Sequence, residues 1–384
     1  MHTELLTTVK TSSQDLRVVE TNPQTDPRWE SFVVEHPNGS IYHHPAWLGA
    51  LEREYGQKGV YFVCEDATGQ VLAILPMVYT RGLPFNLGRR LRPLIGRRFS
   101  SLPRTPVAGP LSRDSQATVA VLQEAVQQVS RNPGVQLQIK TQGRELDGLV
   151  DGIVCTPWRL SYLLHLPVSS EGPFRISNRD SRASVKRAIN KATRLGVYTR
   201  PAETEAELSA WYGLYLETMQ YHAVPPRPYR FFVALWELLK PRGMMQLLLA
   251  ERQTVRSQRI IAGSIFLRFG RTVSYAFGGS RRGDLSLRPN DVIQWQAINE
   301  ACRSGFRFFD FGEVPEGHDD LARFKSKWGS EPLRLYRYYY PACTDLENGS
   351  VEFGGYLELL KKTVWRRLPL TATAWLGDRL YKYL

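Results

Sequence analysis

The sequence predicts a mixed α/β or α+β protein with two similar halves, from three observations. Strand-like and helix-like segments alternate along 384 residues, a length that suggests two or three domains of about 150 residues each. The composition, 42% hydrophobic and 23% charged, is that of a globular protein and not of a disordered or fibrous one. A hairpin whose second strand carries an apolar core recurs, at Ala73–Leu75 and again at Ala262–Ile265. A helix and a strand follow later in each half, which indicates internal duplication.

The first half follows a disordered tail predicted over residues 1–16, and we take residues 17–165 as an N-terminal domain. Two of its helices begin at Pro27 and Pro45, because the first turn of a helix leaves the amide that proline lacks unpaired anyway. The further elements expected are a helix end near residue 55, two strands around a turn at 66–69, a loop at 82–110, a helix at 116–130 and a strand at 135–142.

The second half, residues 166–345, repeats this rhythm and carries the main motifs. Its first helix is closed by Gly196, a residue type that ends helices in the left-handed conformation. Asn290 can cap a later helix that Gly305 ends. The elements expected are a strand near 162–167, helices at 179–195, 205–221 and 229–239, two strands within 245–269, a strand at 272–280, a helix at 291–304, and strands at 306–312 and 333–341.

Composition and spacing exclude several classes of protein. The longest apolar stretch, Val71–Tyr79, is far shorter than the roughly 18 residues that a membrane helix needs. The N-terminus lacks the basic and then apolar design of a signal peptide, so we expect a cytoplasmic protein. Four separated cysteines and seven histidines show neither CxxC nor HExxH spacing, so no metal is expected. His43 and His44 precede a proline and are expected to cap or pack.

Positive charge is concentrated in two segments. The chain has 50 Lys and Arg against 37 Asp and Glu, a net charge of +13. Residues 81–104 hold seven arginines and no acid, and residues 175–200 hold eight basic residues and one acid, which accounts for the excess. Clustered charge favours polyanionic partners such as nucleic acid, nucleotide phosphates or an anionic membrane face. A generally basic, solvated surface is the alternative.

The helix predicted at 179–195 carries one of these clusters. Val185, Ile189 and Leu195 lie on its apolar face, and cations spaced three or four residues apart line the other faces. Such cations repel one another on an isolated helix, so contact with phosphates explains them, and a solvated basic face explains them equally. The predicted substrate- and phosphate-binding residues are Arg182, Lys186, Arg187, Lys191 and Arg194, together with Arg281, Arg288 and Asn290.

Two further segments carry candidate catalytic groups. The strand predicted at 306–312 delivers Asp310 and Glu313, and a carboxylate at a strand end is where a general base or an orienting group would lie. Capping of the next turn is the alternative for Asp310. Lys325 lies among aromatic residues, where a lysine can stabilise an oxyanion or a phosphate. The alternative is a helix end whose cations complement the helix dipole.

Several motifs together resemble the Fem family of peptidoglycan interpeptide-bridge aminoacyltransferases and their acetyltransferase-like relatives. They are HPAWL at 44–48, the basic helix, RPNDVIQWQAINEACRSGFRFFDFG at 288–312 and ARFKSKWG at 322–329. The resemblance covers most of the chain and implies tandem GNAT-like domains, each a mixed twisted sheet flanked by helices. It also implies that Phe324 and Lys325 stabilise the transfer intermediate, and that Asp310–Gly312 borders the substrate groove.

The resemblance implies a transferase that moves an activated acyl or aminoacyl group to an amine of a cell-envelope precursor, without a tightly bound cofactor. Aminoacyl-tRNA is the donor in the family; acyl-CoA is the alternative, although the sequence lacks the R/Q-x-x-G-x-G/A turn of simple acetyltransferases. Muramyl-peptide-transferring members tend to carry a lysine where this chain has Leu51, and residues 218–222 lack a phosphate-binding arginine. The acceptor therefore stays open, as peptidoglycan or polysaccharide building block. A non-catalytic polyanion-binding module is a further hypothesis.

The C-terminal segment 346–384 is predicted to be a basic amphipathic helical tail. Its apolar face can pack on the second domain, or residues 351–384 can lie on an anionic membrane surface near lipid-linked substrates. The residues of that face are Leu357, Leu360, Val364 and Leu368.

Overall fold

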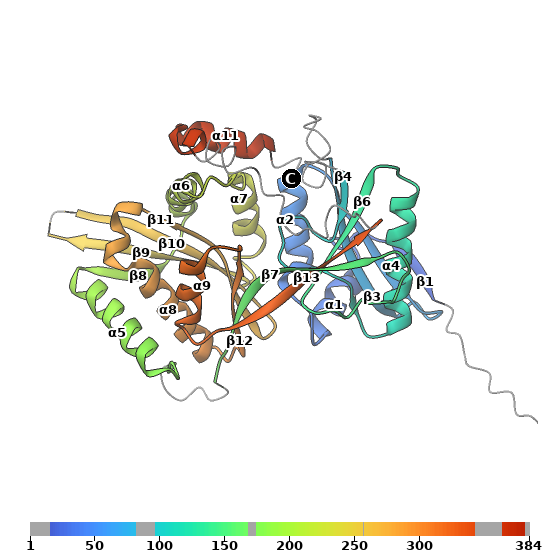
Figure 1. The fold of residues 1–384 in the computed structure, drawn as a ribbon, viewed down its shortest axis with the longest axis horizontal. Coiled ribbons are helices and arrows are strands. Elements are labelled where there is room, and N and C mark those ends of the chain that lie inside the picture. The colour runs from blue at the N-terminus through green and yellow to red at the C-terminus, as the bar shows by residue number, and fades with distance from the viewer. Residues whose placement is uncertain (1–15, 82–96, 168–173, 256, 342–362, 381–384) are drawn as a thin grey trace, which may run out of the picture.

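The computed structural model describes residues 16–81, 97–167, 174–255, 257–341 and 363–380 (Figure 1). Most of the tail predicted at 1–16 and of the helix predicted around 357–368 lies outside these ranges. The elements of the first half are β1 (Arg17–Glu20), α1 (Pro27–Glu35), η1 (Ile41–His43), α2 (Pro45–Tyr55), β2 (Val60–Glu65), β3 (Val71–Thr80), β4 (Arg97–Ser100), β5 (Leu111–Ser112), α4 (Ser115–Ser130) and β6 (Val135–Thr141).

The second half contains a similar succession of helices and strands. The elements are β7 (Val154–His165), α5 (Arg179–Arg194), β8 (Val197–Pro201), α6 (Glu205–Tyr221), α7 (Tyr229–Leu238), β9 (Met245–Thr254), β10 (Ser257–Phe269), β11 (Thr272–Ser280), η3 (Arg282–Leu287), α8 (Pro289–Arg303), β12 (Phe308–Val314), α9 (Asp319–Ser326), β13 (Glu331–Tyr340) and α11 (Leu370–Leu380).

One mixed sheet runs through both halves. Its strand order is β1-β2-β3-β4-β6-β13-β7-β12-β11-β10-β9-β8, with β5 beside β3. The long strands β7 and β13 join the halves, because β13 pairs with β6 on one side and with β7 on the other (Figure 1). The predicted α/β class is confirmed. The domain boundary at 165/166 stays a prediction, since the sheet continues across it.

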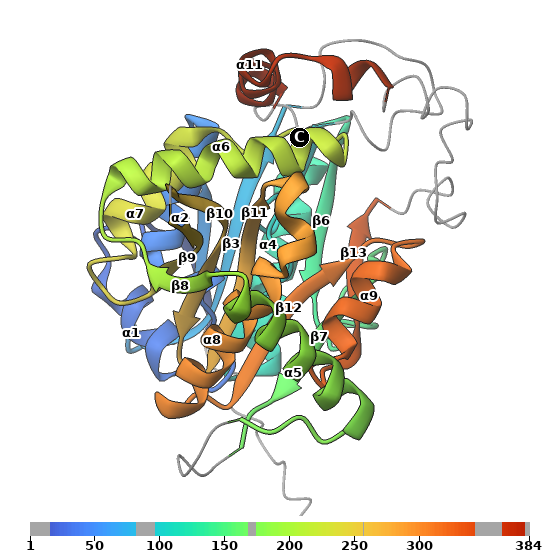
Figure 2. The same cartoon turned by 90° about the vertical axis from the view of Figure 1, so that its left-hand side faces the viewer.

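The helices bury apolar faces on this sheet and on one another. Helix α4 covers β2, β3 and β6, and α8 lies against β9 and β10. A third buried cluster draws on both halves, where the rings of Trp47 in α2 and Phe231 in α7 meet edge to face with centroids 5.6 Å apart. Such aromatic pairs contribute beyond the area that they bury. Helix α11 lies over α6 (Figure 2). Thr373 of α11 is buried, and Asp378 of α11 forms an ion pair with Arg230 of α7.

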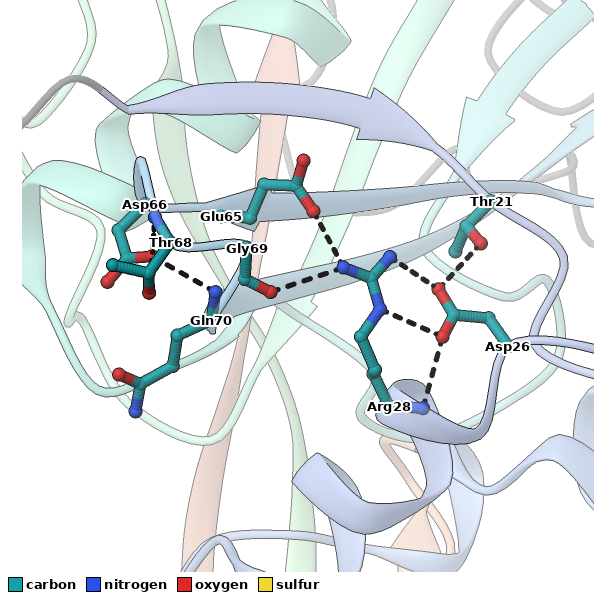
Figure 3. A network of polar contacts seen from close by, with 8 residues as sticks. All are labelled: Thr21, Asp26, Arg28, Glu65, Asp66, Thr68, Gly69 and Gln70. Carbon is teal, nitrogen blue, oxygen red and sulfur yellow. Dashed lines mark hydrogen bonds and ion pairs between the residues drawn. The ribbon is translucent and has the colours of Figure 1, made fainter.

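Helix α1 is fixed to the β2–β3 hairpin by a polar network (Figure 3). Arg28 donates to both carboxylate oxygens of Asp26, at 3.0 and 2.8 Å, to Glu65 Oε2 at 2.8 Å and to the carbonyl of Gly69 at 3.2 Å. Asp26 also caps α1, and its hydrogen bond with Arg28 holds the pKa of its carboxyl below the usual value. The network is exposed, so it fixes geometry more than it adds stability.

Two local predictions need correction. Part of the loop predicted at 82–110 is a strand, because β4 pairs with β3 and with β6. The sequence gives little sign of this strand, because it begins with Arg97 and Arg98 at the end of an arginine-rich stretch. Asn290 does not cap α8, which begins one residue earlier, at Pro289, and follows Arg288 in the left-handed conformation. The expectation for the histidines is confirmed, since His44 Nδ1 accepts from the Ala46 amide at 3.1 Å and caps α2.

Candidate active site

A cleft of about 800 Å³ lies between the two halves of the molecule. The parallel strands β11 and β12 pair only as far as Ser274 and Asp310 and then separate. One wall of the cleft consists of the separated segments 275–278 and 310–313, and Lys325 of α9 lies beside them. Residues of β4, β6 and β13 also line the cleft. Two predicted carboxylates and the predicted lysine therefore line one cleft.

Lys325 is 3% exposed, and its ammonium group is held by backbone oxygens. Nζ donates to the carbonyls of Gly312 at 2.8 Å and Glu313 at 2.9 Å. These carbonyls face the lysine because Gly312 takes a left-handed φ of +73° and the register of β12 shifts between Asp310 and Glu313. Burial lowers the pKa of Lys325 to about 8, although both nearby carboxylates oppose the shift. The ammonium is a positioned donor with a pKa near neutrality.

Asp310 lies at the point where β11 and β12 separate. Its Oδ1 accepts from Ser161 Oγ at 3.0 Å and from the Gly312 amide at 2.8 Å, and burial raises the pKa of the carboxyl. The second of these bonds is the turn capping considered as the alternative. Asp310 also borders a second cavity of about 500 Å³, together with Tyr42 and Ser274, and its predicted chemical role stays a prediction. A carboxyl with a raised pKa is a better proton acceptor near neutral pH.

Glu313 lies further along the same strand and is engaged by groups of β7. Its Oε2 accepts from Trp158 Nε1 at 3.3 Å and lies 3.6 Å from the guanidinium of Arg159. These contacts fix the carboxylate at the edge of the cleft. Both carboxylates line the cleft, and the predicted role of each in proton transfer stays a prediction.

Phe324 lies in α9 beside Lys325 but points elsewhere. Its ring meets Trp328 edge to face with centroids 6.5 Å apart, and the ammonium of Lys327 lies 4.2 Å from its centroid. Among the residues described, the lining of the cleft includes Lys325 and not Phe324. Its predicted role at the transfer intermediate stays a prediction.

The basic helix α5 lies on the outer side of the second half, packed on α8 and β8 (Figures 1 and 2). Its cations are exposed, and within the described part of the chain none of them lines the cleft or the second cavity. Arg182 uses its guanidinium locally, on the carbonyls of Ile176 and Ser177. A phosphate contact by Arg182, Lys186, Arg187, Lys191 and Arg194 stays a prediction, for a surface separate from the catalytic groups.

The three remaining predicted residues lie around the start of α8. Arg281 lies 3.9 Å from Asp284, and Arg288 is exposed at the N-cap. Asn290 accepts from Ser280 Oγ at 2.8 Å. Within the described ranges these three do not line the cleft, and their role stays a prediction.

Sequence reasoning missed Lys140 and Arg337 as residues of the cleft, and it noted Arg98 only as part of the arginine-rich segment 81–104. Arg98, Lys140 and Arg337 lie on β4, β6 and β13 and line the cleft. The available signal is the alternation of polar and apolar residues over 136–140, which is typical of a strand with one polar face. That pattern predicts a strand face exposed to water. In the folded chain the packing of the two halves encloses this face.

Comparisons with known proteins show similarity in sequence over part of the chain. The family model for the acetyltransferase (GNAT) domain matches residues 179–326, which include Asp310 and Lys325. The chain is 24% identical over 156 residues to the UDP-N-acetylmuramoylpentapeptide-lysine N(6)-alanyltransferase of Weissella viridescens. This match covers 40% of the chain and 45% of that protein, so the chain matches less than half of this relative's length.

Solved structures extend the likeness over both halves. The crystal structure of FemX matches with a TM-score of 0.63 and 14% identity, covering 85% of this chain and 98% of FemX. A tandem GNAT protein from the clavulanic acid biosynthesis pathway matches with a TM-score of 0.50 and 11% identity, covering 85% of this chain and 98% of that protein. The chain is similar in fold to both of these proteins, and the predicted tandem GNAT-like fold is confirmed.

The described ranges contain neither a metal-binding group of side chains nor a membrane-spanning helix. Within them, no group of three or more His, Cys, Asp or Glu side chains is placed to hold a metal ion. The helices of the same ranges are all too short or too polar to cross a membrane. A contact of the C-terminal tail with a membrane surface stays a prediction.

Proposed function

We propose that this protein is an acyltransferase that moves an activated acyl group to an amine of a cell-envelope precursor. The observation that carries the proposal is the cleft in which Lys325 and Asp310 lie at the separation of β11 and β12. The similarity to an alanyltransferase named for a lysine of a muramoylpentapeptide supports an amine of a cell-wall precursor as acceptor.

The transfer step uses two groups of this chain. The neutral acceptor amine attacks the acyl carbonyl carbon, the C–N bond forms, and the carbonyl electrons move to oxygen. The Lys325 ammonium stabilises that oxyanion, since a positioned cation in a buried site interacts strongly with developing charge. Asp310 accepts the proton from nitrogen. The carbonyl then re-forms, the C–O or C–S bond of the donor breaks, and the alcohol or thiol leaves with the proton that Asp310 had accepted.

The acyl donor is either an aminoacyl-tRNA ester or an acyl-CoA thioester. Similarity to an alanyltransferase favours the ester, while the match to an acetyltransferase domain over residues 179–326 favours the thioester. Neither donor requires a covalent enzyme intermediate, because the mechanism needs only a positioned oxyanion donor and a base. The alternative function is therefore an acyl-CoA-dependent N-acyltransferase that uses the same Lys325 and Asp310.

The proposal is tested by titrating the full chain with charged tRNA, uncharged tRNA and acetyl-CoA at several salt concentrations, followed by product analysis with the donor that binds. A preference for charged over uncharged tRNA supports an aminoacyl donor. Saturable acetyl-CoA binding with little salt dependence supports the N-acyltransferase. No acyl product with either donor, across cell-wall amines, would sink the proposal.

Substitution of Lys325 tests the chemical step. We expect Lys325→Gln to lower kcat by about 10²- to 10³-fold, the usual effect of removing one oxyanion donor. The matched control is Arg323→Gln, in the same helix, whose guanidinium pairs only with exposed Asp320. Arg323→Gln should keep the wild-type kcat. Equal turnover by Lys325→Gln and wild type would remove Lys325 from the mechanism.

A further inference from the structure

Helix α11 packs on α6 with one face and leaves its opposite face exposed (Figure 2). On the covered face, Gly377 lies so close to the chain before α7 that a side chain there would meet the Pro226 carbonyl oxygen at 2.6 Å. Asp378, the next residue, is held by its ion pair with Arg230 of α7. These contacts fix the helix on the second half, so its outer face has a defined direction.

The outer face of α11 carries an exposed tryptophan. Thr371, Trp375 and Arg379 are spaced four residues apart, so they share one face of the helix, and all three are exposed. Trp375 is 59% exposed, whereas the other tryptophans of the chain are all buried or half-buried. The guanidinium of Arg379 lies over its ring, with Cζ 5.6 Å from the centroid. Apolar surface of this size gains free energy when a partner removes it from water.

Trp375 belongs to a cluster of exposed apolar residues. Val364 lies shortly before α11, and Tyr221 and Val224 lie at the end of α6, on which α11 packs. A hydrogen bond of 2.8 Å from Arg366 Nε to the Tyr221 carbonyl joins the two segments. These four apolar residues are half of the eight large apolar residues that are exposed in the described part of the chain. A single exposed apolar residue is ordinary, but a cluster of them indicates an interaction surface.

Arginines surround these apolar residues. Arg282 and Arg366 both lie over the ring of Tyr221, with Cζ 3.5 and 4.8 Å from its centroid. Arg367 is exposed ahead of α11, and Arg379 is exposed near its end. Within the ranges that the structure describes, none of these four arginines forms an ion pair with a carboxylate.

Acidic residues do not neutralise this surface. The described C-terminal segment 363–380 contains three arginines and one acid, Asp378, which Arg230 already engages. The last two turns of α6 add one carboxylate, Glu217, which is only half-buried and therefore partly screened by water. Positive charge and exposed aromatic rings thus coincide here, whereas the basic helix α5 has cations and no aromatic residue.

This combination fits the surface of an anionic lipid bilayer. Tryptophan and tyrosine rings are favoured at the depth of the lipid headgroups, where an apolar ring and its polar edge are both accommodated. Arginines near the surface are attracted to anionic headgroups. A nucleic acid would also attract the arginines, but it offers no apolar phase to Val224 and Val364.

We propose that the outer face of α11, together with the end of α6, docks on an anionic phospholipid bilayer with Trp375 and Tyr221 at headgroup depth. This docking surface adjoins the cleft, because His222 and Val224 beside Tyr221 also line the cleft. Docking therefore holds that rim of the cleft near the membrane. The inference goes beyond the proposed function and does not depend on it, since lipid binding is measured without turnover.

The first test is co-sedimentation of the full chain with vesicles of phosphatidylcholine alone and of an equal mixture with phosphatidylglycerol. We expect binding to the mixed vesicles that weakens as salt is added. Trp375→Ala should weaken this binding by about tenfold or more, because a large apolar side chain is lost from the contact, and alanine preserves the helix. The matched control is Val34→Ala, which shortens an equally exposed apolar side chain on α1 and should bind as the wild type does.

The charges are tested in the same assay. Arg367→Gln should weaken binding to the mixed vesicles by about fivefold, the usual effect of one basic residue near an anionic surface. The matched control is Arg187→Gln, which removes an exposed cation of α5 and should leave binding unchanged. Thermal melts check folding, and Arg367→Gln decides if Trp375→Ala does not fold.

Fluorescence shows whether Trp375 itself reaches the lipid. Mixed vesicles with brominated acyl chains should quench part of the tryptophan emission of the wild type. Trp375→Phe should still bind but should lose most of that quenching, since the remaining tryptophans are buried or half-buried.

Several outcomes would overturn the proposal. They are no binding to the mixed vesicles, equal losses in a variant and its matched control, and unchanged quenching in Trp375→Phe. Salt-sensitive binding of RNA that Arg367→Gln weakens, without binding to vesicles, would assign the surface to a nucleic acid instead.

Discussion

At the scale of single residues, burial brings the pKa values of Lys325 and Asp310 toward each other. The lysine is lowered to about 8 and the aspartate is raised, because the charged form of each is poorly solvated in the cleft. Both pKa values are therefore shifted toward neutral pH. The hydrogen bonds that Lys325 donates to the carbonyls of Gly312 and Glu313 hold its side chain in place.

These shifts predict a bell-shaped dependence of kcat/KM on pH. Activity should fall as pH rises through about 8, where Lys325 loses its proton, and should fall on the acid side as Asp310 gains one. Initial rates measured across the pH range give both limbs. Lys325→Arg should lose the alkaline limb, because arginine stays protonated. An alkaline limb that persists unchanged in Lys325→Arg would assign it to another group.

At the scale of elements, the shifted register of β12 positions the lysine. Gly312 has a φ of +73°, and this conformation turns its carbonyl toward Lys325. A side chain at this position would meet nothing closer than the Tyr275 carbonyl at 3.6 Å, so space is not the constraint. The constraint is backbone conformation, which disfavours residues other than glycine.

Gly312→Ala should lower both stability and activity. We expect a loss of about 1–2 kcal/mol in the free energy of unfolding and a fall of at least about tenfold in kcat, because the Lys325 acceptor moves. Gly317→Ala is the control, since Gly317 has a φ of +74° and open space around it but no contact with the lysine. Denaturant unfolding and initial rates should show equal stability losses and unequal activities. Equal activities of Gly312→Ala and Gly317→Ala would mean that the register shift of β12 does not position Lys325.

At the scale of the whole molecule, the two halves are held together by a buried ion pair. Glu54 of α2 and Arg227, ahead of α7, are 2.6 Å apart and almost completely buried. Arg227 also donates to the Arg104 carbonyl, so it ties together three segments that lie far apart in the sequence. The cleft lies beside these segments, and its width depends on how the halves pack.

Arg227→Met should destabilise the fold strongly. We expect a loss of about 3–5 kcal/mol, because Glu54 would stay buried without its partner. The control is Arg53→Met, which removes an exposed ion pair with Glu237 across the same α2–α7 contact and should cost less than about 1 kcal/mol. Chemical denaturation measures both. The double variant Glu54→Gln with Arg227→Met should regain part of the loss, and a cost for Arg227→Met as small as that of the control would refute the role assigned to this pair.

The sequence by itself determined the local elements and the motif that carries the candidate chemistry. Periodicity, prolines and glycines place most helices and strands, since these signals act over a few residues. Asp310 was found because it ends a predicted strand, and Lys325 because it lies among aromatic residues in a motif that resembles the Fem family. The duplication signal likewise needed only a repeated local pattern.

The tertiary structure alone decided which charges matter to the cleft. The exposed cations of α5 give the strongest sequence signal and lie outside it, whereas Arg98, Lys140 and Arg337 are scattered in sequence and meet on neighbouring strands. Strand order is set by the packing of the whole chain, and a polar strand face looks the same in sequence whether water or another half covers it. Burial changes the energetics of such a face in a way that the sequence does not show, because a charge becomes costly only where water is excluded.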